Sequence, residues 1–454
     1  MNRIVRVVVG VAVVLGLVMP AAAQEAPRDH VKWTERKKDP VIKEMVERDK
    51  KLEAEARKKT EEILARLKKE EKERRESRPK LRFDVSGIEK PAGPEAFTTA
   101  WHTPPVAQYL TGTCWSFSAT SFMESEVRRL TGQEIKLSEM WTVYWEYVEK
   151  AKGYIESRGT TLFAQGSESN ALIRVYATHG VVPEEAYPGV LAEDGRHDHA
   201  AMVRACREFL EWCKEHDYWD PELIIPTIRR ILDLTMGPPP ETVGWKGATM
   251  TPQEFLEDVC RLDPSAYVSV MSTLSVPFWT HGEYRVPDNW WHDASYVNVP
   301  LDVWYGIIVD AVKAGSTLVI GGDVSEPGYW GEEDIAVVPT FDIPGPYIDQ
   351  DSREFRFYNR TSTDDHGIHL VGWTRVGGHD WFLIKDSARS ARRGKYDGYL
   401  MYRDDYVKLK MLTFTVHRQF LKGILEKVAE TERKLAAEKA GDEAPERPEP
   451  QASH

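Results

Sequence analysis

The sequence predicts an α+β protein in which a mainly helical part precedes a strand-rich part. Behind Cys114, apolar residues recur at helical spacing as far as Leu130, which is typical of a helix buried on one face. Near the other end, residues 368–375 and 381–385 have the character of strands, and they flank Gly377-Gly378. Two such runs around a glycine pair predict an antiparallel hairpin.

The first 23 residues have the pattern of a secretory signal. Arg3 and Arg6 precede an apolar run over residues 7–19, and Ala21-Ala22-Ala23 follows. A positive start, an apolar stretch and small residues before the cleavage point define such signals. We expect cleavage after Ala23 and a periplasmic or secreted mature protein. The alternative, an uncleaved membrane anchor, is less favoured because the apolar run is short for a bilayer.

Residues 24–82 form a second segment, and within it residues 32–80 are charge-dense and helical in pattern. Pro40 suits a helix start, and Pro79 closes the run. The apolar stripe is too thin for a stable coiled coil. We therefore favour a solvated helix that serves as a tether. The alternative is an inhibitory pro-segment, because the segment lies between the signal and Cys114.

A compact domain is predicted over residues 83–425, with an insertion at about 190–345. The insertion is expected to be largely helical, and it includes a helix at 302–314 and a strand at 316–321. The tail, residues 426–454, is charged and contains several prolines. Such a composition is typical of a disordered segment. Helical patterns also occur outside the tail, at 138–147, 170–179, 198–215, 220–235 and from Thr251.

Charge and cysteine content limit the possible functions. The formal net charge of −12 over 454 residues argues against a broad nucleic-acid-binding surface. Cys206 and Cys213 lie seven residues apart in a helical pattern, about 10.5 Å along a helix axis, which is too far for a disulfide. A bridge from Cys260 to one of them stays open. His197-Asp198-His199 is a weak metal candidate, more typical of a surface loop, so we expect no metal or cofactor.

Cys114 is the candidate nucleophile. It follows Gly112-Thr113 and begins the predicted helix, where unpaired backbone N–H groups and the helix dipole converge. This position favours the thiolate, which is the nucleophilic form of cysteine. Gln108 lies six residues upstream, so its side-chain amide could donate to an oxyanion beside the backbone N–H of Cys114. The alternative is a small core residue without a chemical role.

His366 is the candidate general base. Folding the hairpin back about Gly377-Gly378 places His366 roughly opposite Asp386, and facing residues in a ladder have β-carbons about 4.5–5.5 Å apart. Asp386 could then accept a hydrogen bond from one ring nitrogen while the other faces a thiolate. His369 is the rival base, but its side chain points to the other face of the strand.

These motifs resemble those of the papain-like cysteine peptidases. The family has Gln, five residues, then Cys-Trp-[Ser/Ala]-Phe, and later Asp-His-[Ala/Gly] six residues before Gly-[Tyr/Trp]. Here Gln108 precedes Cys114-Trp-Ser-Phe, and Asp365-His366-Gly precedes Gly372-Trp. The resemblance implies a two-lobed fold. A helical left lobe starts at Cys114, and an antiparallel β-rich right lobe carries His366.

The segment between the motifs is similar to the bleomycin hydrolase and aminopeptidase C branch. Asn298-Val-Pro-Leu-Asp302, Leu318-Val-Ile-Gly-Gly-Asp323-Val324 and Thr251-Pro-Gln-Glu-Phe255 match patterns of that branch. The similarity spans about residues 95–420. It implies a peptide or protein substrate, aminopeptidase or endopeptidase action, no cofactor and a homo-oligomer.

Carried over residue by residue, the resemblance implies a site. Gln108 takes the oxyanion donor's place, Cys114 the nucleophile's and His366 the base's, while Asp386 stands where the family has its orienting asparagine. Substrate contacts are expected from the Gly166-Ser167 backbone, Trp115 and Asp365.

We favour a secreted cysteine peptidase, but three departures from the family leave other functions open. Asp386 replaces the asparagine, and Ser167 carries a side chain where the family usually has glycine. Ala388-Arg389 replaces the Trp-Gly that covers the histidine's contact, so we expect a wetter and weaker contact. The alternatives to a peptidase are a catalytically impaired binding or scaffold protein, and a zymogen silenced by residues 32–80.

Overall fold

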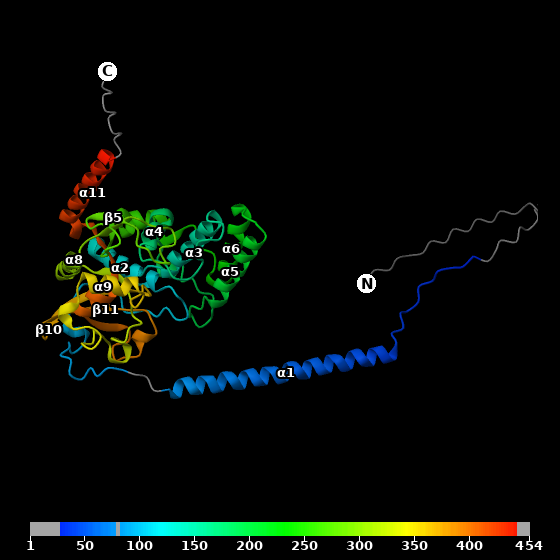
Figure 1. Ribbon diagram of the computed structural model, residues 1–454. Coiled ribbons are helices and arrows are strands. Elements are labelled where there is room, and N and C mark those ends of the chain that lie inside the picture. The colour runs from blue at the N-terminus through cyan, green and yellow to red at the C-terminus, as the bar shows by residue number, and fades with distance from the viewer. Residues whose placement is uncertain (1–27, 79–81, 443–454) are drawn as a thin grey trace, which may run out of the picture. The chain divides into compact units, whose positions relative to one another are not determined.

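The computed structural model describes residues 28–78 and 82–442, which fall into two units divided after Leu81. The first unit contains one long helix, α1 (Pro40–Ser77), drawn in blue in Figure 1. The predicted signal, residues 1–23, lies outside the described residues. Among the helices of the described ranges, none is both long and apolar enough to cross a membrane.

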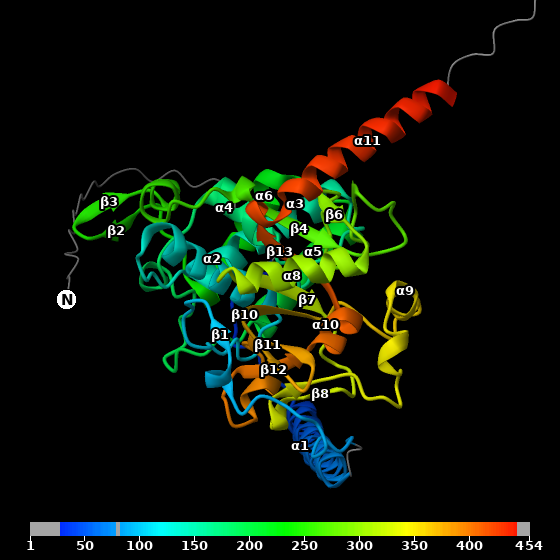
Figure 2. The ribbon, with the colours of Figure 1, turned by 90° about the vertical axis from the view of Figure 1, so that its left-hand side faces the viewer.

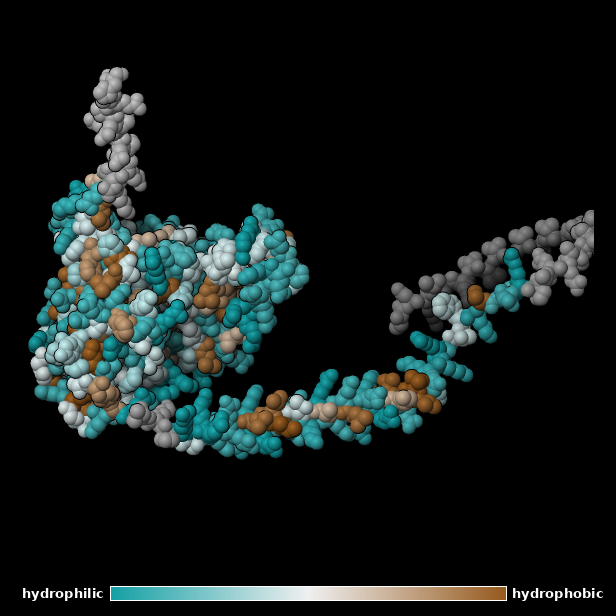
Figure 3. Space-filling view, in the orientation of Figure 1, coloured by the Kyte–Doolittle hydropathy of each residue, from teal (hydrophilic) through white to brown (hydrophobic). Residues whose placement is uncertain are grey.

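Helix α1 starts at Pro40, as the sequence predicts. The Asp39 side chain accepts from the N–H groups of Val41 and Ile42, which satisfies two of the unpaired donors of the first turn. No described side chain of α1 is buried. The space-filling view shows a largely hydrophilic rod with short, separated apolar patches (Figure 3). A single solvated helix is consistent with the expected tether.

The second unit opens with five helices that surround the first of its apolar cores. Figures 1 and 2 show four of them, α3 to α6, grouped on one side of this unit, away from β10 to β12. The predicted helix start at Cys114 is observed, and the side chains of Ser138 and Thr251 cap the helices that follow them. The five helices are α2 (Cys114–Thr131), α3 (Glu139–Glu156), α4 (Ala171–His179), α5 (Ala200–Glu215) and α6 (Pro221–Met236).

One large sheet carries the rest of the unit. Its strand order is β5-β6-β4-β13-β7-β10-β11-β12-β9-β8, and β1 (Thr98–Thr99) pairs with β10. The central strands are β4 (Tyr267–Met271), β13 (Met411–His417), β7 (Leu318–Gly322), β10 (His366–Val376), β11 (His379–Lys385) and β12 (Tyr399–Arg403). The outer strands are β5 (Thr280–Gly282), β6 (Tyr296–Asn298), β9 (Ile335–Ala336) and β8 (Tyr329–Trp330).

The remaining elements are short or cover the sheet. They are the hairpin β2 (Val243–Trp245) and β3 (Ala248–Met250), and the helices α7 (Pro252–Glu254), α8 (Leu301–Lys313), α9 (Gln350–Tyr358), α10 (Asp404–Lys410) and α11 (Lys422–Asp442).

The hairpin of β10 and β11 has the predicted turn. Val376 pairs with His379, so Gly377 and Gly378 form a two-residue loop. Their φ angles of 61° and 83° are left-handed, which is the requirement of the tight turn that matches strand twist and favours glycine. The register shifts between Leu370 and Gly372, which lie between His366 at the start of β10 and the turn.

Two predictions of organisation are wrong in part. The middle region is not largely helical throughout, because β4, β5 and β6 lie between α7 and α8 and belong to the main sheet. The predicted helix at 302–314 and strand at 316–321 are observed as α8 and β7. The tail is not disordered from residue 426, because α11 runs to Asp442. Leu421 and Val428 are buried in the core around the sheet, and Ile424 and Leu425 pack against it. This apolar stripe stabilises a helix whose charge content suggested disorder; residues 443–454 lie outside the described residues.

Candidate active site

Cys114 occupies the first position of α2 and is half-buried. The N–H groups of Ser116 and Phe117 donate to the Thr113 carbonyl, at 2.9 and 3.2 Å. The first helical hydrogen bonds therefore start after the cysteine. The backbone N–H groups of the first turn lie beside the thiol, as the sequence predicts for a helix N-terminus.

The loop before Cys114 is held from two sides. The Gln108 N–H donates to the Ser387 carbonyl at 3.0 Å, and the Gly112 N–H donates to the Gln165 side chain at 2.7 Å. Between them, Tyr109 has a φ of 53°, which is unusual for a residue with a side chain. Such strain persists where surrounding contacts fix the backbone.

The His197-Asp198-His199 segment has a structural role that the sequence did not reveal. The Leu110 N–H donates to the His197 carbonyl at 3.1 Å, and the His199 N–H donates to the Leu110 carbonyl at 3.4 Å. The segment thus pairs with the loop that precedes Cys114. Within the described ranges, no group of three or more ligating side chains could hold a metal ion.

The start of β10 lies directly against the first turn of α2. A β-carbon built on Gly367 would come within 3.2 Å of the Trp115 α-carbon and 3.0 Å of the Ser118 hydroxyl. Only glycine fits such an approach without a shift of its neighbours. Because Gly367 follows His366 and Trp115 follows Cys114, the contact brings the two candidate catalytic residues together.

His366 is paired with Asp386, as the hairpin geometry predicts. The His366 Nε2 and the Asp386 Oδ1 are 2.7 Å apart. The same carboxylate oxygen accepts the Ala388 N–H at 2.8 Å, and the Asp386 N–H donates to the Gly398 carbonyl at 2.8 Å. These contacts fix both the ring and the carboxylate. The other oxygen, Oδ2, is buried and has no hydrogen-bond partner among the described residues.

The expectation of a wet contact is wrong. The side chains of His366 and Asp386 are only 7% and 0% exposed. The backbone around Ala388 and Gly398 folds over the carboxylate, and Tyr329 and Tyr402 lie close enough for the charge of Asp386 to raise the pKa of both phenols, in addition to burial. The contact between His366 and Asp386 is therefore dry, although the family's Trp-Gly pair is missing.

The electrostatics of His366 favour its charged form. Burial alone would lower the pKa of this imidazole, but the negative charges of Asp386 and Cys114, and a hydrogen bond to each, raise it well above its ordinary value. An opposite charge close to an imidazole stabilises the imidazolium. The protein therefore favours an imidazolium that is oriented by a carboxylate and lies next to Cys114.

His369, the rival base, belongs to the interior. It is fully buried, and its Nδ1 lies 2.8 Å from the Ser121 hydroxyl. Burial, with the nearby positive charge of Lys385, lowers its pKa well below the ordinary value. His369 points to the face of β10 opposite His366, as the alternation of a strand requires.

Gln108 is buried and joins the loop before Cys114 to the segment that follows β11. Its Oε1 accepts the Ser387 hydroxyl at 2.7 Å, and its Nε2 donates to the Thr111 carbonyl at 2.7 Å. An amide nitrogen has two N–H groups. One remains for an oxyanion, since Thr111 takes the only hydrogen bond that this nitrogen donates within the described residues.

Gly166 and Ser167 follow Gln165, which touches the nucleophile loop. The Trp115 indole N–H donates to the Gln165 carbonyl at 3.0 Å. The Ser167 hydroxyl donates to Glu146 at 2.7 Å and is directed into the protein. The extra side chain therefore points away from the surface of the Gly166-Ser167 segment, which removes one of the three doubts raised by the sequence.

Of the two side chains expected to contact the substrate, Trp115 is buried and Asp365 is exposed. Trp115 is 2% exposed, so its ring supports the segment around Gln165 from inside. The prediction of a substrate contact by this side chain is wrong, because the ring packs in the helical core. Asp365 is exposed, and its carboxylate accepts the Val324 N–H at 2.9 Å.

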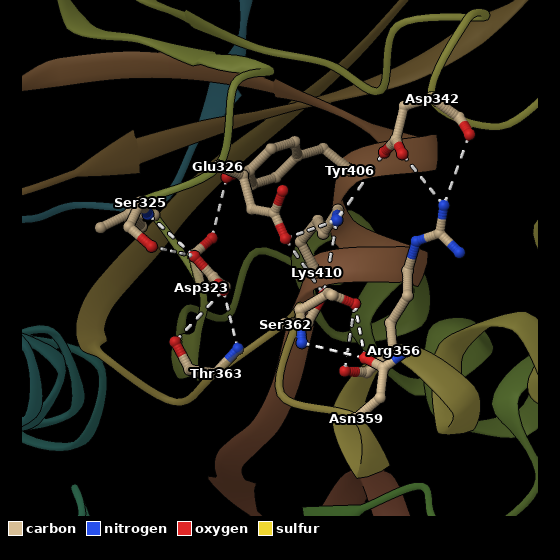
Figure 4. A network of polar contacts seen from close by, with 12 residues as sticks. Asp323, Ser325, Glu326, Asp342, Arg356, Asn359, Ser362, Thr363, Tyr406 and Lys410 are labelled. Atoms are coloured by element: carbon tan, nitrogen blue, oxygen red, sulfur yellow. Dashed lines mark hydrogen bonds and ion pairs between the residues drawn. The ribbon is translucent and has the colours of Figure 1, made fainter.

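A polar network that the sequence did not reveal holds the chain ahead of His366 (Figure 4). Asp323, at the end of β7, accepts the Thr363 N–H at 2.7 Å and the Ser325 N–H at 2.8 Å. The Tyr406 hydroxyl donates to the Asp323 carbonyl at 2.8 Å. In the sequence, the Gly-Gly-Asp-Val pattern of residues 321–324 indicated the family branch but gave no sign of this network.

The three other cysteines are buried thiols without disulfide bonds. Burial raises the pKa of Cys206 and of Cys260 to about 12, and it also raises the pKa of Cys213. The possible bridge from Cys260 is not formed. Cys114 is the one cysteine of the four that is not buried.

The fold and this constellation of cysteine, histidine and aspartate are those of the papain-like class. The Peptidase C1-like family matches residues 89–437. The chain therefore belongs to this family, and the predicted resemblance to the aminopeptidase C branch is confirmed.

Individual relatives are distant. Aminopeptidase C of Listeria monocytogenes serovar 1/2a is 23% identical over 262 residues, and that of Streptococcus thermophilus is 22% identical over 262 residues. Each match covers 48% of this chain and 58% of the relative, so the chain matches little more than half of their length. The crystal structure of PepW from Lactobacillus rhamnosis HN001 matches with a TM-score of 0.59 at 18% identity, covering 74% of this chain and 85% of that one. This similarity supports the fold alone.

Proposed function

We propose that the protein is a cysteine peptidase that hydrolyses peptide bonds through a thioester on Cys114. The observation that carries the proposal is the dry His366–Asp386 pair, 2.7 Å apart, at the start of a strand that touches the first turn of α2. A nucleophile, a base and a group that orients the base are the parts that covalent acyl transfer needs.

The proposed reaction has two halves, formation of a thioester on Cys114 and its hydrolysis. The Cys114 sulfur attacks the peptide carbonyl carbon, and the Gln108 amide with the backbone N–H of Cys114 stabilises the oxyanion. The C–N bond then breaks, and His366 gives its proton to the leaving amine. In the second half His366 takes a proton from water, which hydrolyses the thioester and restores the thiolate. Asp386 keeps the ring oriented throughout. No cofactor takes part.

The names of the matched relatives support aminopeptidase action, with endopeptidase action as the other outcome of a substrate test. We also propose that the mature protein acts in the periplasm or outside the cell, on the basis of the signal pattern over residues 3–23. Sequencing of the N-terminus of the exported protein checks this, and an N-terminus at Gln24 is expected.

An irreversible epoxide that alkylates thiolates tests the chemistry. We expect one equivalent of label on Cys114, found by mass spectrometry of the digested protein. The three buried cysteines are expected to remain unlabelled, since burial raises the pKa of each thiol. His366→Ala should abolish labelling, while His379→Ala, which alters an exposed histidine on the same hairpin, should not.

The same experiment separates the alternatives. Hydrolysis of a peptide library by the wild type, lost in Cys114→Ala, supports the peptidase. Labelling that appears only after residues 24–81 are removed would favour a zymogen. Absence of labelling in both forms would contradict the proposal and favour a binding or scaffold protein.

A further inference from the structure

Three carboxylates gather beside the Gly166-Ser167 segment, and the proposed chemistry does not use them. A β-carbon built on Gly166 would lie 2.3 Å from the Asp288 carboxylate, so this carboxylate rests against the backbone of Gly166. Glu168 follows two residues later and is 6% exposed. Asp364 precedes the candidate base His366 by two residues and lies close to both other carboxylates.

Packing places Glu168 and Asp364 at one location. Glu168, Tyr296, Gly321 and Thr413 surround the same closely packed spot. A β-carbon on Gly321 would lie 3.6 Å from the Asp364 Oδ1. The segment that carries Glu168 also reaches the start of β10, since the Ser169 hydroxyl would be 3.4 Å from a β-carbon on Gly367. The acidic cluster therefore lies next to Cys114 and His366.

Burial raises the pKa of Asp288 and the nearby Lys150 lowers it, but Glu168 and Asp364 have few polar contacts. The strongest contact of Glu168 is a long one, 3.4 Å from the Tyr296 hydroxyl. Asp364 Oδ2 is buried with no hydrogen-bond partner among the described residues, and the hydroxyl of Tyr284 beside it, a residue only 2% exposed, is likewise without one there. Within the same part of the chain, no Lys or Arg side chain forms an ion pair with Glu168 or Asp364. Buried carboxylates without a partner are costly.

The titration behaviour agrees with this geometry. Burial, together with the charges of Asp364 and Asp288, raises the pKa of Glu168 well above its ordinary value, and Cys114 adds to the effect. Burial and the neighbouring carboxylates raise the pKa of Asp364 to about 7, against the lowering effect of Tyr284. A positive charge placed among these groups would relieve both the burial cost and the mutual repulsion.

We propose that Glu168, Asp288 and Asp364 bind a positively charged group of the peptide substrate next to the scissile bond. This inference rests on the proposed peptidase function and defines its substrate class. An ammonium or guanidinium group satisfies the chemistry, so the group is either a Lys or Arg side chain or the N-terminal ammonium of the peptide. The unpartnered Tyr284 hydroxyl and Asp364 Oδ2 supply hydrogen-bond sites for it.

Matched fluorogenic peptides test the proposal with the full-length protein. Arg is compared with citrulline, its neutral isostere, at the first and second positions before the scissile bond, each with a free and an acetylated N-terminus. In one of these two comparisons, Arg with citrulline or a free with an acetylated N-terminus, we expect kcat/KM of the charged peptide to be higher by about tenfold or more. A side-chain ligand gives this ratio between Arg and citrulline, whereas a terminal ligand gives it between the free and acetylated peptides.

Glu168→Gln and, separately, Asp288→Asn should bring the decisive ratio toward one, while hydrolysis of the neutral peptide and epoxide labelling of Cys114 continue. Glu193→Gln, an exposed acid in a loop, should leave the ratio unchanged. Labelling and cleavage of neutral peptides without any preference for charge would overturn this inference alone. Absence of both labelling and cleavage would overturn the peptidase function and this inference with it. If Glu168→Gln fails to fold, the wild-type ratios and the half-buried Asp288→Asn still decide.

Discussion

Gly367 and Trp115 are so close that a β-carbon on the glycine would lie 3.2 Å from the α-carbon of the tryptophan. The contact joins β10, which carries His366, to α2, which carries Cys114. Each of the two contacting residues directly follows one of these site residues. The separation between the sulfur and the imidazole is therefore set by backbone packing. Flexible side chains alone would leave it poorly defined, and a shift of 1 Å in such a site costs about 100-fold in rate.

The first prediction concerns this contact. Gly367→Ala should lower kcat/KM by about tenfold to 100-fold, because the added methyl group pushes α2 away from β10. Gly306→Ala is the matched control. Gly306 lies inside α8 with open space around it, so the change should preserve kcat/KM and stabilise the helix by about 1 kcal/mol. Equal kinetics in the wild type and Gly367→Ala would show that the contact does not position the site.

Gln108 is predicted to act on the transition state. Gln108→Ala should lower kcat by about 100-fold to 1000-fold, the usual effect of removing one oxyanion donor, with little change in KM. Gln108→Glu retains an oxygen for the Ser387 hydroxyl but loses the donor, so it should lower kcat as well. Gln419→Ala, on the exposed surface, serves as the control. A change confined to KM would argue for a binding role.

Sequence patterns sufficed for the elements whose geometry is local. The turn at Gly377-Gly378 brings the start of β10 beside the end of β11, so the hairpin alone predicts that His366 lies near Asp386. Counting back from the turn places Arg389 opposite His366, so the hydrogen bond to Asp386 depends on the path of the chain after Lys385. The helix start at Cys114 follows from the turn before it. The apolar stripe that includes Leu421 and Val428 was also visible, but the charge of the surrounding residues concealed it.

Contacts between distant segments could not be worked out in this way. Asp288 meets Gly166 across 122 positions, as the residue numbers show, and no periodicity connects the two segments. The dryness of the His366–Asp386 pair likewise depends on backbone near Gly398 and on tyrosines from other strands. Burial is a property of the whole packed unit, so a local substitution such as Ala388 for the family's tryptophan predicted the wrong outcome.

The charge of Asp386 is predicted to tune the pH range of the enzyme. Asp386→Asn keeps an oxygen for His366 and for the Ala388 N–H, so the ring stays oriented and turnover should persist. Because Asp386 raises the pKa of His366, its neutralisation lowers that pKa. The imidazolium then loses its proton at lower pH, and the alkaline limb of the kcat/KM profile should move to lower pH. A loss of about 10⁴ in kcat would instead indicate a wrong tautomer.

Ser167 is predicted to contribute to stability and not to catalysis. Its hydroxyl bonds to Glu146, which is fully buried and also accepts the Trp290 indole N–H at 2.7 Å. Ser167→Ala should lower the free energy of unfolding by about 1.5–3 kcal/mol, typical of a hydrogen bond to a charged group. Its kcat/KM should stay at the wild-type value. Urea unfolding and peptide hydrolysis measure the two effects, and an altered kcat/KM with unchanged stability would refute the assignment.

Lys385 is predicted to make stability rise with pH. The side chain is buried and donates to Thr103 and Ser121 at 2.6 and 2.7 Å. Burial lowers its pKa to about 8, although Glu124 opposes the effect. In the unfolded chain a lysine keeps its proton to about pH 10.4. Between these values the unfolded state binds more protons, so this residue's contribution to the free energy of unfolding increases as the pH rises.

Lys385→Met removes this titration. The free energy of unfolding of the wild type minus that of the variant should therefore grow by about 3 kcal/mol between pH 7 and pH 10.5. Urea unfolding at several pH values measures the difference, and Lys395→Met, at an exposed position, should show a constant one. A difference that is flat or shrinks for Lys385→Met would mean that the buried lysine stays protonated, stabilised by Glu124 through the polar contacts at Thr103.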